Sequence, residues 1–587
     1  MISSRLVAHA LLTLLVSGCH QTATPHPTPD AGPAACTEDR YDGGSLSFIP
    51  DPTRADAGCD WPQWGQNWAH TGASCVPAQG FARALASITF DPFVPLEVAE
   101  AQRVFRRGDL FAHYGSPLVV GDDLYLGVKA GTYVSCLPPG HPVSCGFDAW
   151  NQQVWTVEHH AWVSGTLTFQ RSYASDWKPP PWQLVRAWEP VFQPAVHDQV
   201  VWVPGSSGTV VRLDRQVGGA VTINPFATLD PNRYVTGPLV VDADGTLLYN
   251  VVELDAANPV TGDARGYLVR VPPDPDTTHP PTIVGYQSIV AGAPAPTDLC
   301  PPATSGRASP CGSQRPGFNS GPAIGPGGVI FVVSRSRYAQ NDSALVALNP
   351  DLSPRWTFRM REILCDGCGV LVSCAPGRLP GTDPNTGRKG SIWVNDEASS
   401  VPVALPDGAV LYGGLSSYSG GRGHMIKVSP DGRLMGHYDF GWDVTPAVWL
   451  HDGTYSIVTK DNHYPVTTDG SEGPYDMTQL SPDLVPEWKF TSTETRSCVT
   501  DADGGVSCVS DHQDGFEWCV NAPAVAPDGT IYANSEDGRV YAIRQGGTLG
   551  EQRFLVQSLG AAYTPIVIDS QGRVYSMNGG LMTVVGQ

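Results

Sequence analysis

The chain has 587 residues, with 57 Asp and Glu against 36 Lys and Arg, so its formal net charge is −21. A charge of this sign repels phosphate backbones and anionic lipid surfaces, and we therefore expect no nucleic-acid partner. The chain contains 64 Gly and 53 Pro, and it shows hardly any apolar pattern of helical period beyond the N-terminus. This composition predicts a turn-rich, all-β protein.

Residues 1–19 have the pattern of an export signal. Arg5 precedes an apolar run at residues 6–16, and Ser17, Gly18 and Cys19 follow it. The run is too short to span a membrane. The ending Val-Ser-Gly-Cys resembles a bacterial lipobox, which implies lipidation at Cys19; the alternative is an ordinary signal peptide. We expect an exported protein that is anchored by lipid to the outer membrane, facing either the periplasm or the cell surface.

A flexible tether is predicted for residues 20–58, whose first part is rich in Pro, Thr and Ala. The remaining residues, 59–587, form the predicted folded domain.

Cysteine spacing supports export, because disulfides persist outside the cytoplasm. Without Cys19 there are 13 cysteines, an odd number. The run CDGCGVLVSC, with Cys365, Cys368 and Cys374, could suggest zinc, but no second CxxC or nearby His pair completes a site, and we expect no metal there. One of these three, Cys519 or Cys36 is expected to stay unpaired. Close spacing predicts four bridges: Cys59 with Cys75, Cys136 with Cys145, Cys300 with Cys311, and Cys498 with Cys508.

A repeated unit organises most of the chain. Each copy has a Pro within a short apolar run, then a Gly or Asp turn, then an apolar or aromatic strand, as in residues 521–547. Such a unit cannot bury both of its faces alone and needs neighbours of the same kind. The eight copies lie at Pro117, Pro194, Pro238, Pro322, Pro402, Pro446, Pro523 and Pro565.

Two stretches carry a family resemblance. Residues 60–72 read DWPQWGQNWAHTG and residues 537–547 read DGRVYAIRQGG. Both resemble bacterial propellers built from quinoprotein-type (PQQ-like) repeats, and the resemblance covers about residues 61–586. It implies a single β-propeller, which usually has seven or eight four-stranded blades and leaves only short protected sheet edges.

The spacing of the motif prolines favours eight blades. The shortest intervals, 42 to 44 residues, fit one four-stranded blade, and the longer ones, 77 to 84 residues, fit one blade with an insertion. If the motif lies on the first strand, the large excursions and the longer hairpin tips all lie on one face. The excursions are predicted at residues 132–190, 272–319, 363–400 and 492–520.

The residues just before the motif prolines are expected to line the mouth of the central channel, where they could hold a small ligand or serve only as turns and packing. They are His113, Tyr114, Asn319, Asn395, Asp396, Trp442, Asp443, Asn521 and Tyr563.

The sequence favours a binding scaffold over an enzyme. Enzymes of the resembling family hold a quinone and Ca²⁺, yet adjacent cysteines are missing here and the family's docking pattern keeps only Trp356 and Trp488. No nucleophile motif or metalloprotease motif is present. We therefore expect no cofactor, no catalytic residue and no metal, and a protein or glycan partner on the loop-bearing face. The alternatives are a divergent PQQ-dependent oxidoreductase and a surface carbohydrate or matrix binder.

Overall fold

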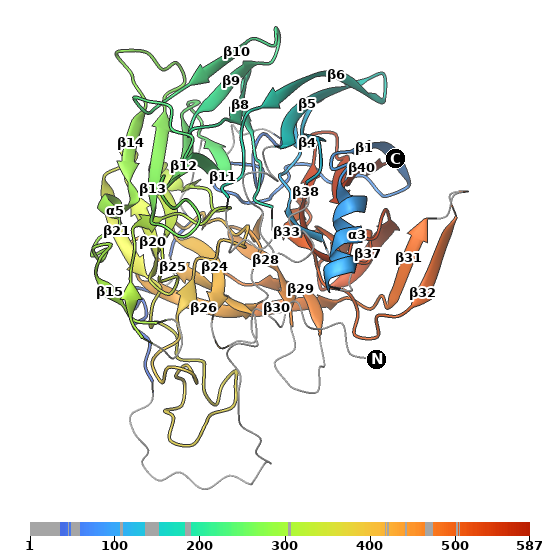
Figure 1. The fold of residues 1–587 in the computed structure, drawn as a ribbon. Helices are drawn as coiled ribbons and strands as arrows, with labels where there is room; N and C mark the ends of the chain where they lie inside the picture. Colours follow the sequence, from blue (N-terminus) through green and yellow to red (C-terminus); the bar gives the residue numbers. More distant parts are fainter. Residues whose placement is uncertain are drawn as a thin grey trace.

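The computed structural model describes residues 36–44, 46–48, 59–105, 110–134, 152–181, 189–302, 307–416, 418, 422–440, 443–463, 473–500, 503 and 505–587. Eight of the ten sheets in the described residues are arranged around one axis, each with one motif proline at or next to its innermost strand (Figure 1), and the other two are small two-stranded sheets. The predicted eight-bladed, all-β propeller is therefore confirmed. We number the blades 1 to 8 in the order of the prolines and call their strands A to D from the axis outward.

Blades 1 and 2 are regular antiparallel sheets. They consist of β3 (Leu118–Val120), β4 (Asp123–Gly131), β5 (Gln153–Val163) and β6 (Thr166–Ser175), and of β7 (Ala195–His197), β8 (Val200–Pro204), β9 (Val210–Asp214) and β10 (Ala220–Ile223).

In blades 4 and 5 the innermost position is split between two short strands that both pair with strand B. Blade 3 consists of β11 (Arg233–Val241), β12 (Leu247–Leu254), β13 (Ala264–Val271) and β14 (Thr282–Gly285). Blade 4 consists of β17 (Gln314–Arg315) and β18 (Ala323–Ile324), β19 (Ile330–Ser336), β20 (Ser343–Leu348) and β21 (Pro354–Arg359). Blade 5 consists of β22 (Ile392–Trp393) and β23 (Val403–Ala404), β24 (Val410–Ser416), β25 (Gly423–Val428) and β26 (Leu434–Phe440).

Blade 8 closes the ring by combining both ends of the chain. Its outermost strand β1 (Arg83–Thr89) pairs antiparallel with β40 (Leu581–Gly586), so the blue and red ends of the chain lie side by side in Figure 1. The other strands are β38 (Gly560–Ile568) and β39 (Val574–Asn578). Blade 6 consists of β27 (Ala447–His451), β28 (Thr454–Asn462), β29 (Tyr475–Leu480) and β30 (Pro486–Thr491), and blade 7 of β34 (Ala524–Val525), β35 (Ile531–Asn534), β36 (Arg539–Arg544) and β37 (Thr548–Phe554).

The remaining elements lie between blades. The 12-residue helix α3 (Val94–Phe105) follows β1 and was not expected, because hardly any apolar pattern of helical period was predicted beyond the N-terminus. The helices among the described residues are too short or too polar to cross a bilayer. The short elements are β2 (Leu110–His113), α5 (Tyr286–Ile289), β15 (Leu299–Cys300), β16 (Ser309–Pro310), the 3-10 helix η2 (Pro326–Gly328), β31 (Arg496–Thr500), β32 (Val506–Ser510) and β33 (Val520–Ala522).

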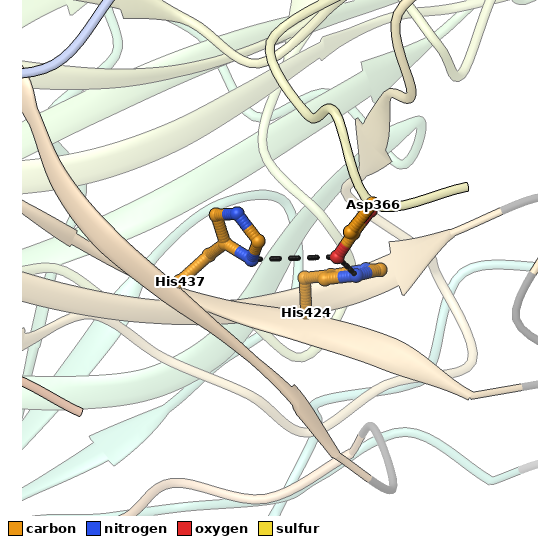
Figure 2. Close-up of side chains that lie close together, drawn as sticks. All are labelled: Asp366, His424 and His437. Carbon is orange, nitrogen blue, oxygen red and sulfur yellow. Dashed lines mark hydrogen bonds and ion pairs between the residues drawn. The ribbon is translucent and has the colours of Figure 1, made fainter. Parts of the chain in front are cut away.

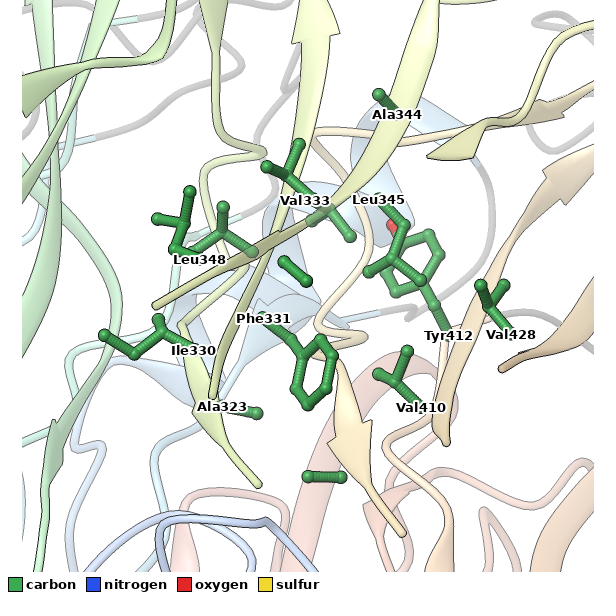
Figure 3. Close-up of a cluster of buried hydrophobic side chains, with 14 of the residues drawn as sticks. Ala323, Ile330, Phe331, Val333, Ala344, Leu345, Leu348, Val410, Tyr412 and Val428 are labelled. Carbon is green, nitrogen blue, oxygen red and sulfur yellow. The ribbon is translucent and has the colours of Figure 1, made fainter. Parts of the chain in front are cut away.

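The core consists of apolar side chains packed between neighbouring blades. One cluster joins blades 3, 4 and 5, and Figure 3 shows Ile330, Phe331 and Val333 of blade 4 beside Val410 and Tyr412 of blade 5. Consecutive residues such as Ile330 and Phe331 are both buried, because a strand that lies between two neighbouring blades buries both of its faces. Packing between blades therefore builds one continuous body.

The axis itself is closed by residues 61–79, which we call the plug. In seven blades the innermost strand exposes one unpaired edge toward the axis, and the plug hydrogen-bonds to it there. In blade 8 the innermost strand β38 pairs with β2 and β33, and the plug hydrogen-bonds to the turn between β38 and β39. In six blades the bonded amide is two residues after the motif proline. The pairs are Trp61 with Val119, Pro62 with Val196, the Gln63 side chain with Val241, Trp68 with Ile324, Ala69 with Ala404, Thr71 with Val448, Gly72 and Ser74 with Val525, and Gln79 with Gly572, at 2.7 to 3.0 Å.

Trp64 fills the middle of this plug. It is fully buried, packs against Val191, Val401 and Ala522 from three blades, and donates its indole N–H to Thr445 Oγ1 at 3.1 Å. The plug is therefore part of the core.

One interpretation of the insertions was wrong. Residues 132–190 were expected to be a single excursion, but β5 and β6 of blade 1 lie within them. The reason is that β5 and β6 are long, partly exposed strands whose polar residues hide the usual alternation. The antiparallel order still puts B–C loops and D-to-next-A connections on the same face, which we call the loop face.

Disulfides hold several connections on this face. Bonds join Cys300 to Cys311 and Cys498 to Cys508, and Cys59 is joined to Cys75 next to the plug, all as expected from spacing. The expected Cys136–Cys145 bridge lies outside the described residues, as does Cys19. Five disulfides in the described part of the chain are typical of a protein that folds outside the reducing cytoplasm.

Two disulfides were not expected. Cys368 bonds to Cys374, and Cys36 bonds to Cys365, 329 residues away, so these cysteines are not available as zinc ligands. Cys519 is buried and keeps its thiol. Residues 36–44, which the sequence assigned to the tether, also contact blade 5 through the Arg40–Leu434 bridge.

The close packing around the plug predicts that replacing Gly72 by Ala lowers the free energy of unfolding strongly. Gly72 has φ +58°, and a Cβ there would lie 2.7 Å from the Pro523 carbonyl oxygen; Gly453 has φ +74° and nothing within 4 Å. Alanine at either position costs about 1–2 kcal/mol for the left-handed backbone. Gly72→Ala should lose a further 1–3 kcal/mol or so through overpacking. Denaturant midpoints of both variants test this, and equal losses would contradict the role of the plug.

Candidate functional site

The channel mouth on the loop face is where the predicted ring residues were expected to meet. His113 ends β2, and its Nε2 lies 3.0 Å from Asp443 Oδ2. The other oxygen of Asp443 accepts hydrogen bonds from the amide and hydroxyl of Ser399, at 2.5 and 2.8 Å. All three residues are buried. These contacts connect the approaches to blades 1, 5 and 6.

Tyr563 continues this group on the side of blade 8. Its ring stacks on His113, with centroids 5.3 Å apart, and its carbonyl oxygen accepts a hydrogen bond from Asn521 Nδ2 at 3.3 Å. The structure therefore brings His113, Asp443, Asn521 and Tyr563 together. They form a connected layer at the mouth.

A second group lies between blades 4 and 5. Asp396 accepts a two-pronged hydrogen bond from Arg315, with both N···O distances 2.7 Å, and a third from Arg335 at 3.0 Å. Burial alone would raise the pKa of Asp396, but the two guanidinium groups outweigh it and hold the pKa at about 2. Asn319 joins this group through the Asp396 carbonyl oxygen, at 3.3 Å.

Three of the predicted ring residues have other roles or lie outside the described residues. Tyr114 donates its hydroxyl to Asp91, which in turn forms an ion pair with Lys129. Asn395 accepts a hydrogen bond from the Glu397 amide within its own turn. Trp442 lies outside the described residues.

Lys460 is the main residue at the mouth that sequence reasoning missed. It lies on β28, is fully buried, and its Nζ is 4.0 Å from the centroid of the Tyr563 ring. Its Nζ has no hydrogen-bond partner in the part of the chain that the structure describes. Burial lowers the pKa of this amine, while nearby Asp443 raises it. The only feature of the sequence that pointed to Lys460 was its place in the strand after the one that follows motif proline Pro446.

The carboxylates at the mouth do not converge on one point. Asp396 is paired with two arginines, and Asp443 is hydrogen-bonded to His113 and to the Ser399 donors. A Ca²⁺ ion needs six to eight oxygen ligands, so it would have to break these bonds to use either carboxylate. Asp396 and Asp443 therefore do not offer free oxygen ligands for Ca²⁺.

A cavity of about 520 Å³ lies elsewhere, on the face opposite the loop face. It is lined by turns of blades 5 and 6 and by residues of the N-terminal segment, including Tyr41 and Leu46. Lys427 at its wall is already bonded to Asp407 and Tyr455, at 2.9 and 2.7 Å. The cavity is separate from the channel mouth.

The structure resembles other propellers in fold. No protein-family model and no curated protein matches the sequence. Similar solved structures include BamB from Moraxella catarrhalis (14% identity, TM-score 0.36, covering 81% of this chain and 96% of that one). They also include the quinohemoprotein alcohol dehydrogenase ADHIIG from Pseudomonas putida HK5 (12%, 0.47, 93% and 79%) and the designed protein Ika8 (11%, 0.38, 82% and 96%). At these identities the likeness concerns the fold alone.

Asp396→Asn should destabilise the protein strongly, because Arg315 and Arg335 lose their shared counter-charge in a buried site. Breaking a buried ion pair from one side costs about 3–5 kcal/mol. Since the folded pKa of Asp396, about 2, is below the unfolded value, this stability is present above about pH 4 and is lost as pH falls toward 2. The free energies of unfolding of the wild type and of Asp396→Asn, measured at pH 7 and at pH 3, check this pH dependence. A difference that grows toward low pH would contradict it.

Proposed function

We propose that the protein is an exported scaffold, anchored by lipid at Cys19 to the outer membrane, that binds a protein partner through its loop face. The observation that carries this proposal is the position of exposed apolar side chains. Each of the three disulfide-stapled excursions on the loop face puts large aliphatic groups into solvent: Leu299 beside Cys300, Val370 and Leu371 inside Cys368–Cys374, and Val499, Val506 and Val509 around Cys498–Cys508.

The hairpin of β31 and β32 is the clearest of these excursions. It stands clear of the blades in Figure 1, forms a two-stranded sheet of its own and is joined across the middle by Cys498–Cys508. Val499 and Val509 lie on the face away from this disulfide. Exposed apolar groups on a rigid support lose little conformational entropy on binding, which favours recognition. Because the exposed groups are mostly aliphatic, a protein partner fits them better than a glycan does.

Photocrosslinking tests which face binds. A photoreactive amino acid at Val509 or Val370, which are 66% and 64% exposed, should give a discrete crosslinked product in cells of the source organism. Val217 and Val485 are matched controls, because they are 81% and 59% exposed but lie in C–D turns on the opposite face. They should give none. Equal crosslinking from both faces, or products from the opposite face alone, would refute the proposal.

Lys460 favours a second candidate function, the binding of a small anionic molecule at the channel mouth. A buried ammonium group without a hydrogen-bond partner is costly, and an anionic ligand would remove this cost. The quinone cofactor of the PQQ-dependent oxidoreductases, the enzyme alternative from the sequence, belongs to this chemical class.

Thermal unfolding with the quinone, with and without Ca²⁺, distinguishes the two functions. A ligand at 100 times its dissociation constant adds about 2.7 kcal/mol of stability. The scaffold proposal predicts no shift in melting temperature with either addition. A shift in the wild type that disappears in Lys460→Met would instead establish the second candidate.

A further inference from the structure

Two histidines and an aspartate meet where an insertion packs on blade 5. His424 lies on β25 and His437 on β26, while Asp366 belongs to the stapled excursion that follows blade 4. Figure 2 shows the three side chains pointing toward one another. His424 is fully buried, and the side chains of the other two are only 11–12% exposed. The cluster is thus built by three segments that are far apart in sequence.

The distances in the cluster are close to those of a metal site. Asp366 Oδ2 lies 2.7 Å from His424 Nε2 and 3.4 Å from His437 Nδ1, and all three ligand atoms lie within 4.8 Å of one another. Around Zn²⁺, with bonds of about 2.0–2.2 Å to nitrogen and carboxylate oxygen, tetrahedral ligands lie about 3.4 Å apart. His424 would have to move by less than about 1 Å for its Nε2 to reach this spacing from Asp366 Oδ2.

Neighbouring groups hold the ligands in place. Glu38 Oε1 lies 2.9 Å from His437 Nε2, the ring nitrogen that faces away from Asp366. Metal-bound histidines commonly donate this second N–H to a carboxylate, which fixes the ring and its tautomer. Tyr418 donates its hydroxyl to Asp366 Oδ1, which leaves Oδ2 for the ion. Glu38 on His437 and Tyr418 on Asp366 therefore already orient two of the three ligands.

The charges near the cluster are mixed. An Arg40 nitrogen lies 3.4 Å from His437 Nε2 and pairs with Glu38, and Arg422 pairs with Asp439. However, no Lys or Arg forms an ion pair with Asp366, whose ion pairs among the described residues are with the two histidines alone. Asp439, the strand partner of His424, has a buried oxygen, Oδ1, without a hydrogen-bond partner among the described residues. A second group, Asp461 with His463 and Asp476, differs because Arg422 and Lys489 already occupy Asp461 at 2.9 and 2.7 Å. Those cations would repel a metal ion.

We propose that Asp366, His424 and His437 bind one Zn²⁺ ion through Oδ2, Nε2 and Nδ1, with a water molecule in the fourth position. Asp439 Oδ1 is available to accept a hydrogen bond from this water. The role of this site is structural. It joins the excursion that carries Val370 and Leu371 to the β-sheet of blade 5, and through Glu38 it also joins the N-terminal segment to that sheet. It does not depend on the identity of the partner.

Metal analysis of the full chain tests this proposal. The protein is purified, treated with EDTA, supplied with Zn²⁺ and dialysed; one Zn²⁺ per chain should remain. Asp366→Asn, His424→Gln and His437→Gln should each weaken Zn²⁺ binding more than 100-fold, and Glu38→Gln by about 10–100-fold. His451→Gln is the matched control, because His451 lies on blade 6 and bonds only to Ser456 and Asp452 in the contacts described. The His451→Gln variant should bind Zn²⁺ as the wild type does, and Ca²⁺ should not compete with Zn²⁺ for the site.

X-ray absorption at the zinc edge of the wild type keeps the test valid if a variant fails to fold. The proposal predicts first-shell nitrogen and oxygen only, with the scattering of two imidazole rings. Sulfur in the first shell, binding unchanged in all three ligand variants, or less than about 0.1 Zn²⁺ per chain would overturn it. In each of those cases the cluster is only a hydrogen-bonded contact.

Discussion

The inner strands of seven blades each present one open edge to the same axis, and residues 61–79 hydrogen-bond to all seven; in blade 8 the inner strand β38 pairs with β2 and β33, and the plug bonds to the turn that follows it. An open edge of this kind exposes backbone donors that cannot be left unpaired in a buried channel. In six blades the donor is the amide two residues after the motif proline, so the repeat and the plug depend on each other. The motif proline lies at or next to each inner strand. The hydrogen bond to the plug explains why the amide two residues later recurs at the same place in six blades.

This arrangement separates stability from recognition. The plug hydrogen-bonds to the ends of the inner strands nearest the A–B turns, which leaves the loop face free to vary. The excursions there are held by disulfides and by a few buried residues such as Leu364 and Trp518, so their exposed tips can change with little cost to the ring. The mouth of the channel lies between these two regions. Its carboxylates are used to join blades, as Asp396 and Asp443 show.

The repeat made the fold predictable, because each blade carries its own proline and turn signals within about 25 residues. The ring at the mouth was partly predictable for the same reason: His113, Asp443, Asn521 and Tyr563 meet, since the residue before each motif starts at the axis. Tyr114 and Asn395 sit in equivalent places but turn to local partners, Asp91 and Glu397. Side-chain direction at a loop depends on contacts that spacing does not encode.

Contacts between distant segments could not be predicted at all. The Cys36–Cys365 bond, the pairing of β1 with β40 and the Asp366–His424–His437 cluster each join segments whose separation carries no pattern. The two histidines lie on adjacent strands and are 13 positions apart in the sequence, so no short metal-binding motif marks them. Lys460 was missed because a single Lys in a strand is normally exposed, and only the closed ring buries it.

Native-state hydrogen exchange of the plug-bonded amides tests most directly whether residues 61–79 unite the eight blades. The amides of Val196, Ile324, Ala404 and Val448 come from four different blades and each donates to the plug. If the plug joins the ring, these amides exchange at one common slow rate that reports global unfolding. Four distinct rates, with any of these amides exchanging as fast as those of the exposed β31–β32 hairpin, would show that the blades open independently and would contradict the account.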